Sequence, residues 1–346
     1  MRFKCVSKLW HCTIEESDFV AMHLKHSALS VANWYVFLME WHFSRNQMSS
    51  LYPDKSLTVA SQLEIKVPFI SPMGSYNIVG SCNGLICIAD VNDEDRSHKI
   101  FLWNLFTRKY KAIPSSHLDF VDMYVALGFG YSDSINDYKI VRITYFPDKC
   151  GYGGYLGGLE PKVDVYSLNT DMWRTVKFDV ARELSDRSIV SLNGNLHWIS
   201  IDVNEDRCWC YGSIITFGVA DEVFNEMPLP KSCFVGIMLF RAYLAVLNNS
   251  LVLLIHQVDP RGQSKDTCYI WVMTEYGVPK SWTKLHTLDL DEGVSKFHGF
   301  TRSGELLMET CQHELILWNP SMGLTRFIRT LGAFDLATVV ESLVSP

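Results

Sequence analysis

A two-part motif recurs along this chain of 346 residues, and it constrains the fold more than any other feature of the sequence. The first part is a tight turn followed by an apolar strand, and its copies are residues 81–88, 133–143, 192–198, 247–253 and 303–308. Four of these turns contain Asn-Gly, Asn-Asn or Ser-Gly, pairs that adopt positive φ with little strain, and the copy at 133–143 has a longer turn. The motif therefore predicts a hairpin at each copy.

The second part of the motif is an apolar strand, a polar turn and a short strand that carries an aromatic residue. Its copies follow those of the first part, at residues 100–114, 163–176, 214–230, 269–288 and 315–331. Each double unit can supply four short antiparallel strands and spans about 50 residues, near the kelch period. We therefore predict a mainly β chain with a β-propeller-like repeat domain of about five to six four-stranded blades.

The propeller follows from the need to cover both faces of each sheet. Radial stacking buries each face against the next blade and leaves only short edges. A strand within residues 337–344 is expected to pair with material from residues 57–70 and to close a further blade from both ends of the domain. A twisted β-sandwich also accepts many short strands, but it does not require the same two-part unit five times.

The first 27 residues differ in kind from the rest, because their apolar residues recur at the spacing of an amphipathic helix. These residues are Phe3, Val6, Leu9, Trp10 and Ile14. Ser17 or Asp18 is expected to N-cap a second helix that runs through Leu24. So short a helical pair must dock on the β domain or on another chain.

Several segments resemble one family. Residues 1–24 look like the second half of a plant F-box. The segments VGSCNGLICI (79–88), LWNLFTRKYKAIP (102–114) and GFGYSDSINDYKIVRI (128–143) resemble the F-box-associated domain of the large plant F-box/kelch-type group. The likeness divides the chain into a helical F-box remnant at 1–27, a connecting segment with the first strands at 28–79, and a kelch-like propeller at 80–346.

The resemblance implies a substrate receptor of an SCF-type cullin–RING ubiquitin ligase, a subunit that performs no chemistry itself. The F-box would hold a Skp-type adaptor and through it the cullin, and the β domain would bind an unknown target protein. Residues that match the F-box motif are the candidates for adaptor contact: Arg2, Lys4, Lys8 and Trp10. The other reading is that Phe3, Val6, Leu9 and Trp10 only pack the helices together. No residue is indicated for target binding.

The family's F-box opens with a Leu-Pro-containing helix, and this sequence is expected to lack that half. Two alternatives therefore stand beside the ligase subunit. One is a protein-binding module without ligase coupling. The other is a member of the similar S-locus F-box-like group, which recognises ribonucleases in self-incompatible plants. A propeller enzyme would need carboxylates or a Tyr/His/Cys metal set clustered at the propeller axis, and the sequence shows no such cluster.

Charge and hydropathy limit the partners and the location. The net charge of −7 and the lack of a dense basic run argue against nucleic acid. The most apolar stretch, Phe234 to His256, contains Arg241 and a polar triplet at 248–250, so it predicts two strands around a turn rather than a membrane span. Ten scattered cysteines and no signal peptide indicate free, buried thiols in the cytosol or nucleus.

Other possible sites are weaker. Cys208-Trp209-Cys210 and Cys311-Gln312-His313 have one residue between ligands, which is not the usual zinc spacing, and His23 and His26 lack a third ligand. We therefore predict no metal site and no cofactor. The glycine-rich stretch 151–158 lacks the Lys-Ser/Thr of a phosphate-binding loop, so a loop between strands is expected. Six tryptophans at equivalent blade positions are expected in the core: Trp103, Trp173, Trp198, Trp271, Trp282 and Trp318.

Overall fold

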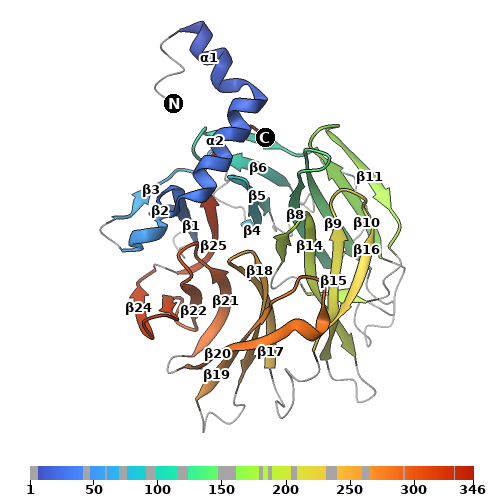
Figure 1. Cartoon of the computed structure of the whole chain (residues 1–346), viewed down its shortest axis with the longest axis vertical. Helices are drawn as coiled ribbons and strands as arrows, with labels where there is room; N and C mark the ends of the chain where they lie inside the picture. The colour runs from blue at the N-terminus through green and yellow to red at the C-terminus, as the bar shows by residue number, and fades with distance from the viewer. Residues whose placement is uncertain are drawn as a thin grey trace.

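A computed structural model gives the fold of the chain. It describes residues 7–41, 47–58, 61–69, 76–90, 99–114, 124–146, 161–178, 182–185, 189–203, 209–230, 240–258, 265–290, 293–330 and 332–346. Six antiparallel sheets stand around a common axis as the blades of a propeller, and two helices precede them (Figure 1). The prediction of a mainly β propeller of four-stranded blades behind a short helical segment is confirmed.

The blades are numbered in chain order, and within each blade the strands are given from the axis outward. Blade 1 consists of β25 (Ala333–Val340), β1 (Trp34–Trp41), β2 (Gln47–Pro53) and β3 (Leu63–Glu64). Blade 2 consists of β4 (Tyr76–Cys82), β5 (Leu85–Asp90), β6 (Ile100–Asn104) and β7 (Lys109–Ala112). Blade 3 consists of β8 (Tyr124–Ser132), β9 (Asp137–Tyr145), β10 (Lys162–Ser167) and β11 (Met172–Val176).

The second half of the ring repeats this plan. In blade 4 the inner position is divided between two short strands, so the blade comprises β12 (Glu183–Leu184), β13 (Val190–Leu192), β14 (Asn195–Val203), β15 (Trp209–Gly218) and β16 (Phe224–Pro228). Blade 5 consists of β17 (Phe240–Leu247), β18 (Ser250–Gln257), β19 (Asp266–Met273) and β20 (Trp282–Leu290). Blade 6 consists of β21 (Val294–Phe300), β22 (Leu306–Thr310), β23 (Leu315–Asn319) and β24 (Leu324–Ile328).

The sequence repeat maps directly onto blades 2 to 6. Each copy of the first part spans the turn between the two inner strands, and each copy of the second part forms the outer hairpin. The inner turns have the positive φ expected from their residues, for example 52° at Asn83 and 82° at Gly84. The stretch predicted to form two strands around a turn also does so, as β17 and β18 around Asn248-Asn249.

Blade 1 is closed by both ends of the domain, as expected, but the pairing partner was predicted wrongly. β25 pairs with β1 from Trp34↔Val340 to Trp41↔Ala333, and not with residues 57–70. That segment contributes only β3, at the outer edge of the same sheet. Pro68 cannot donate to a central ladder, whereas β1 is an apolar run with a buried centre. Strands therefore begin well before residue 80.

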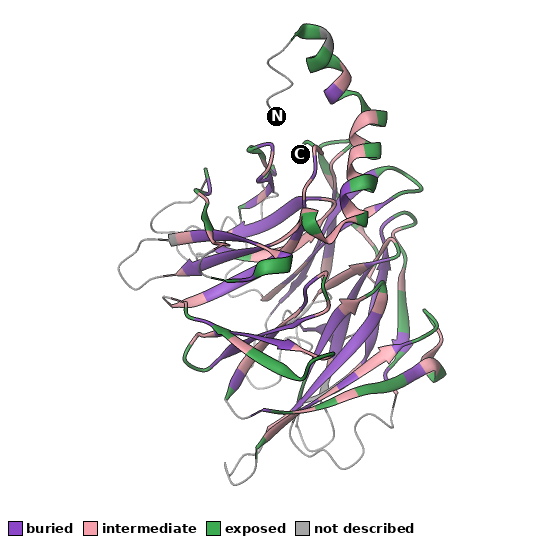
Figure 2. Ribbon diagram, turned by 60° about the vertical axis from the view of Figure 1, so that its left-hand side comes forward, coloured by how far each residue is buried: buried purple, intermediate pink, exposed green. Residues whose placement is uncertain are grey.

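Apolar side chains between the blades make up the core (Figure 2). Blades 5 and 6, for instance, meet through Tyr243, Leu254, Phe297 and Met308, all at most 3% exposed. Of the six tryptophans expected in the core, four are buried and two are half-buried. The buried ones are Trp103, Trp198, Trp282 and Trp318, and the half-buried ones are Trp173 and Trp271. The expectation of equivalent blade positions is wrong, because the six lie on second, third or fourth strands of their blades.

The antiparallel order gives the propeller two different faces. One face carries the turns between the first and second strands and between the third and fourth strands of each blade, and we call it the turn face. The opposite face carries the connections from second to third strand and from blade to blade, and we call it the loop face. β1 begins and β25 ends at the turn face, so both helices and the C-terminal residues lie there (Figure 1).

The helices are α1 (Lys8–Glu15) and α2 (Ser17–Leu29). α1 is capped by Ser7, whose hydroxyl accepts from the Trp10 backbone N–H. The predicted cap of the second helix is wrong: Glu16 is the N-cap residue, so Ser17 is already helical, and the helix runs past Leu24 to Leu29. No helix in the described part is long and apolar enough to span a membrane.

Contacts with the propeller hold the helical pair in place. The Trp34 indole N–H donates to the Ala28 carbonyl at 3.2 Å, and the Lys109 ammonium on blade 2 lies 3.6 Å from the Glu15 carboxylate. α2 also packs against β25. The expectation that the helices dock on the β domain is therefore met by α2 directly and by α1 through one exposed ion pair.

Candidate recognition surfaces

Two of the four residues predicted to contact an adaptor can be placed. Lys8 and Trp10 both lie on α1 and are exposed, with 49% of Trp10 accessible to solvent. Arg2 and Lys4 lie outside the described residues. Adaptor contact by these residues stays a prediction.

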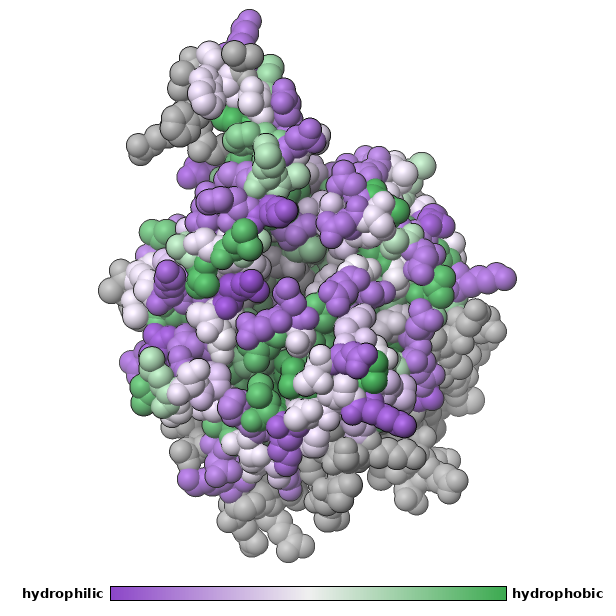
Figure 3. All heavy atoms as spheres, in the orientation of Figure 1, coloured by the Kyte–Doolittle hydropathy of each residue, from purple (hydrophilic) through white to green (hydrophobic). Residues whose placement is uncertain are grey.

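The helical pair exposes further apolar side chains. Besides Trp10, these are Met22 and Leu29 on α2, which are 65% and 78% exposed. Green apolar atoms are visible among polar ones on the helices in Figure 3. These apolar side chains are accessible for contact with another chain. These two α2 residues were not identified from the sequence.

A second group of exposed apolar residues lies on the turn face, at or beside the turns of blades 3 to 6. They are Ile135, Met172, Val223, Tyr276 and Met322, between 39% and 70% exposed. We call this group the apolar turn residues. Sequence reasoning missed them, although a signal was present: each is an apolar residue inside or next to a polar turn, where local structure does not require one.

The turn face is held rigidly where it meets the C-terminal residues. The Asn104 side-chain amide donates to the carbonyls of Ser342 and Val344 at 3.0 and 2.8 Å, and its oxygen accepts from the backbone N–H groups of Phe106 and Thr107. Gly84 approaches so closely that a Cβ there would lie 2.3 Å from the Ser342 Cβ. The tail is thus fixed on blade 2.

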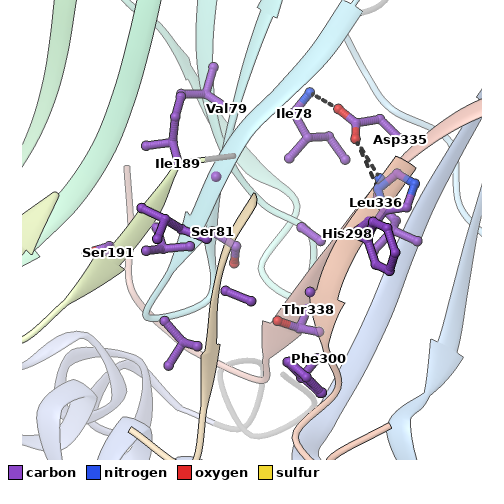
Figure 4. Close-up of a pocket in the computed structure, with 18 of the residues that line it drawn as sticks. Ile78, Val79, Ser81, Ile189, Ser191, His298, Phe300, Asp335, Leu336 and Thr338 are labelled. Atoms are coloured by element: carbon purple, nitrogen blue, oxygen red, sulfur yellow. Dashed lines mark hydrogen bonds and ion pairs between the residues drawn. The ribbon is translucent and has the colours of Figure 1, made fainter. Parts of the chain in front are cut away.

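A cavity of about 640 Å³ runs along the propeller axis between the inner strands. Its lining residues reach the turn face at Trp34, Asn83, Asn248, Asn249 and Arg302. Nearer the loop face the lining includes Lys296, His298 and Asp335 (Figure 4). We call this cavity the axial channel and its turn-face end the mouth.

The polar groups at the loop-face end of the channel satisfy one another. Asp335 accepts from the Lys296 ammonium at 3.1 Å and from the Ile78 backbone N–H at 2.9 Å. His298 Nε2 lies 3.3 Å from a Glu309 oxygen, and its Nδ1 lies 3.7 Å from Asp335. These bonds join β21 and β22 to β25 and β4, so the cluster is a tie between blades 6, 1 and 2.

Burial sets the protonation of this cluster. It lowers the pKa of His298, more than the hydrogen bond to Glu309 raises it. Burial alone would raise the pKa of Glu309, but hydrogen bonds from His298 and His313 outweigh it, and the net pKa is lowered. At neutral pH His298 is therefore uncharged and Glu309 is ionised, an arrangement that stabilises structure.

The other residues considered from the sequence as metal ligands or as a phosphate-binding loop do not form a common site in the described part of the chain. Cys311 is exposed, His313 bonds to Glu309 at 2.7 Å, and His23 and His26 lie on α2 without a shared ligand. Cys208, the side chain of Cys210 and the glycine-rich stretch 151–158 lie outside the described residues. Within the described part, no group of three or more His, Cys, Asp or Glu side chains could hold a metal ion.

Fold and surfaces together define a six-bladed propeller with a helical pair and exposed apolar residues on one face, the kind of scaffold that binds other molecules. Residues 31–302 match the family model of the F-box associated beta propeller domain. The chain belongs to this family, and the expected resemblance to plant F-box proteins is confirmed.

Individual relatives agree with this assignment. The F-box/kelch-repeat protein At3g23880 of Arabidopsis thaliana is 26% identical over 364 residues, covering 100% of this chain and 90% of that protein. The F-box protein CPR1 of the same plant is 26% identical and covers 86% of this chain and 70% of its own length. Among solved structures, the α-L-arabinofuranosidase of Lactobacillus brevis has a TM-score of 0.44 at 10% identity, covering 74% of this chain and 94% of that one. Similarity at that level does not indicate a shared activity.

Proposed function

We propose that this protein is the target-recognition subunit of an SCF-type ubiquitin ligase. The helical pair would hold a Skp-type adaptor and through it a cullin, and the propeller would bind a target protein. In this proposal the chain is not an enzyme. It acts by bringing a target lysine close to a ubiquitin-conjugating enzyme, which raises its effective concentration. Such work belongs to the cytosol or nucleus, in keeping with the free thiols of Cys12, Cys87 and Cys268.

The observation that carries the proposal is the exposed apolar surface of the helical pair on an F-box associated propeller. Trp10, Met22 and Leu29 are exposed at the end of the molecule where α2 packs on β25. An adaptor that covers these side chains would gain about 25 cal/mol for each Å² of apolar area that it removes from water. Fixed attachment also favours a defined orientation between adaptor and target.

Co-purification of the full chain with a Skp-type adaptor and a cullin tests the ligase connection. Trp10→Ala should weaken adaptor recovery by about tenfold or more, since buried indoles dominate many interfaces. Met322→Ala changes another exposed apolar residue, on the propeller, which is 70% exposed against 49% for Trp10; it is the control and should leave adaptor recovery unchanged. Failure of the unchanged chain to recover any adaptor would support instead a binding module without ligase coupling.

Target recognition is proposed to use the turn face. A double change of Met172→Asp and Met322→Asp places charge at two apolar turn residues that are 65% and 70% exposed. It should abolish recovery of the target by crosslinking while leaving the adaptor bound. Leu63→Asp, at an exposed position on the outer edge of blade 1, is the control. If the double variant still captures the same target, the turn face is not the recognition surface. Recovery of a ribonuclease would favour the S-locus F-box-like alternative.

A further inference from the structure

One arginine stands out at the mouth of the axial channel. The Arg302 guanidinium lies over the Trp34 ring, 5.5 Å from its centroid, and both residues line the channel. The backbone N–H groups of Arg302 and Ser303 each donate to the Asp54 carboxylate at 2.9 Å, and Asp54 is 1% exposed. The turn that carries Arg302 is therefore fixed by a buried carboxylate, and the guanidinium rests on an aromatic face.

Arg302 differs in its pairing from several buried or half-buried cations of this propeller. Arg142, Arg326 and Lys296 each lie within 3.1 Å of a carboxylate oxygen. In the described part of the chain no carboxylate lies within 4.0 Å of the Arg302 guanidinium nitrogens, and Asp54 accepts from the backbone of this turn instead. A cation on a fixed turn at the end of a cavity is placed to bind an anion from outside.

The rest of the channel changes character with depth. Asn83, Asn248 and Asn249 are among the lining residues near the mouth, and the Asn83 side chain is hydrogen-bonded to Tyr138. Below them the walls carry apolar side chains such as Val79, Ile189, Phe300 and Leu336, with the hydroxyls of Ser81, Ser191 and Thr338 between them (Figure 4). At the far end Lys296 and Asp335 neutralise each other.

The change from a polar mouth to apolar walls favours one class of ligand. A wholly apolar molecule would leave the arginine at the mouth without an anionic partner, and a small inorganic anion would leave the apolar walls uncovered. A cavity of about 640 Å³ is within the usual range for small-molecule sites. The self-neutralised far end offers no second charge, so the anionic group belongs at the mouth.

We propose that the axial channel binds a small amphipathic organic anion, whose carboxylate or sulfonate pairs with Arg302 and whose apolar body lies between the inner strands. This site goes beyond the proposed ligase role and does not depend on it. Because the mouth opens within the turn face, the bound head group would form part of the surface proposed to meet the target protein.

The test uses 8-anilinonaphthalene-1-sulfonate, a fluorescent aryl sulfonate, titrated into the full chain. We expect saturable binding of one dye per chain. Arg302→Ala should raise the dissociation constant by about tenfold or more, because a charge-assisted pair is lost. Arg329→Ala removes the same charge at an exposed position outside the channel lining and is the matched control. Arg302→Ala keeps the backbone N–H groups that bond to Asp54, so the turn should stay intact.

Two further measurements distinguish dye binding in the channel from dye binding on the protein surface. Thr338→Phe narrows the channel without removing a charge and should also weaken dye binding by about tenfold. N-phenyl-1-naphthylamine, the same dye without its sulfonate, should bind more weakly and should not respond to Arg302→Ala. The proposal is overturned if the dye does not saturate at one per chain, if Arg302→Ala and Arg329→Ala behave alike, or if Thr338→Phe, with an unchanged circular dichroism spectrum, binds normally. Adaptor recovery is measured separately, so either proposal can fail alone.

Discussion

The two faces of the propeller differ in how the chain crosses them. On the turn face the inner hairpins close in two residues at Asn83-Gly84, Asn193-Gly194 and Asn248-Asn249. On the loop face the chain takes residues 113–123 to pass from β7 to β8 and residues 146–161 to pass from β9 to β10. The contrast holds for these connections and not for every blade: residues 274–281 join β19 to β20 on the turn face, and only residues 291–293 join β20 to β21 on the loop face.

This difference shows which connections tolerate changes in length and residue type and which do not. A two-residue hairpin fixes the register of both strands and needs residues with positive φ, so little can change there. A long connection costs little more than a short one, since closure entropy rises only slowly with length. The helices, the C-terminal residues and the channel mouth all lie on the constrained face, which suits surfaces that must keep a fixed relative position.

The largest expected effect on stability concerns two glycines on the turn face, one with no room for a Cβ atom and one with open space around it. Gly84→Ala would place a Cβ 2.7 Å from the Val340 carbonyl oxygen and 2.3 Å from the Ser342 Cβ, whereas Gly277→Ala meets nothing within 4 Å. Both glycines have positive φ. We expect a loss of about 3–5 kcal/mol for Gly84→Ala and about 1 kcal/mol for Gly277→Ala, measured by urea unfolding. Equal losses would mean that backbone strain alone constrains this face.

A second prediction concerns the buried carboxylate under the channel mouth. Asp54→Ala leaves the backbone N–H groups of Arg302 and Ser303 without their acceptor, and we expect a loss of about 3 kcal/mol in the free energy of unfolding. Asp54→Asn keeps one acceptor oxygen and should lose about half as much. A change below 0.5 kcal/mol, roughly the scatter of surface substitutions, would show that the turn is held by other contacts.

The third prediction is a pH dependence. Burial lowers the pKa of His197 to about 4. The neutral ring donates to the Val190 carbonyl and accepts from the Tyr276 hydroxyl at 2.8 Å, which joins blades 4 and 5 near the turn face. An unfolded histidine titrates near 6.5, so the folded state binds fewer protons between these two values. The stabilisation is therefore complete above pH 6.5 and is lost as pH falls toward 4.

The size of this effect is about 2–3 kcal/mol across that interval. His197→Gln should flatten the dependence of unfolding free energy on pH between 6.5 and 4, measured by denaturant titration at several pH values. His26→Gln, on an exposed position of α2, serves as the control and should leave the slope unchanged. The same slope in the His197 variant would assign the acid sensitivity to other groups.

The smallest effect is expected on the loop face. Insertion of five Gly-Ser residues after Tyr155, within the connection from β9 to β10, should cost less than about 1 kcal/mol. The same insertion between Asn248 and Asn249 on the turn face should cost several times more, because it breaks the two-residue hairpin between β17 and β18. Similar costs at both places, measured by thermal unfolding, would remove the distinction between the two faces.

Local chemistry explains which parts of the fold the sequence predicts. The turn at Asn83-Gly84 depends on its own residue types and on a repeat that recurs in blades 2 to 6, and the burial of Trp198 follows from its place in an apolar strand. The pairing partner of β25 does not follow from local residue types or from the repeat. Pairing of Trp34–Trp41 with Ala333–Val340 joins the two ends of the domain, and no short pattern specifies such a distant partner.

The candidate sites show the same limit. Trp10 was identified because it matches a motif within a single helix. The channel mouth was not, since Trp34, Asp54 and Arg302 come from a strand, a 3₁₀ turn and a hairpin far apart in the chain. Each residue looks ordinary in its own segment, and only ring closure brings the three together.

Closure by β25 also means that the ring cannot close until the last strand of the domain has been synthesised. During synthesis α1, α2 and β1 leave the ribosome first, and β1 lacks its inner neighbour until residues 333–340 have been made. A product that stops short of them would carry the helical pair but would lack one wall of the channel and Asp335. The last strand thus completes the ring: a chain interrupted before it carries the helical pair on an open ring, and the unpaired edge of β1 is free to pair with another chain.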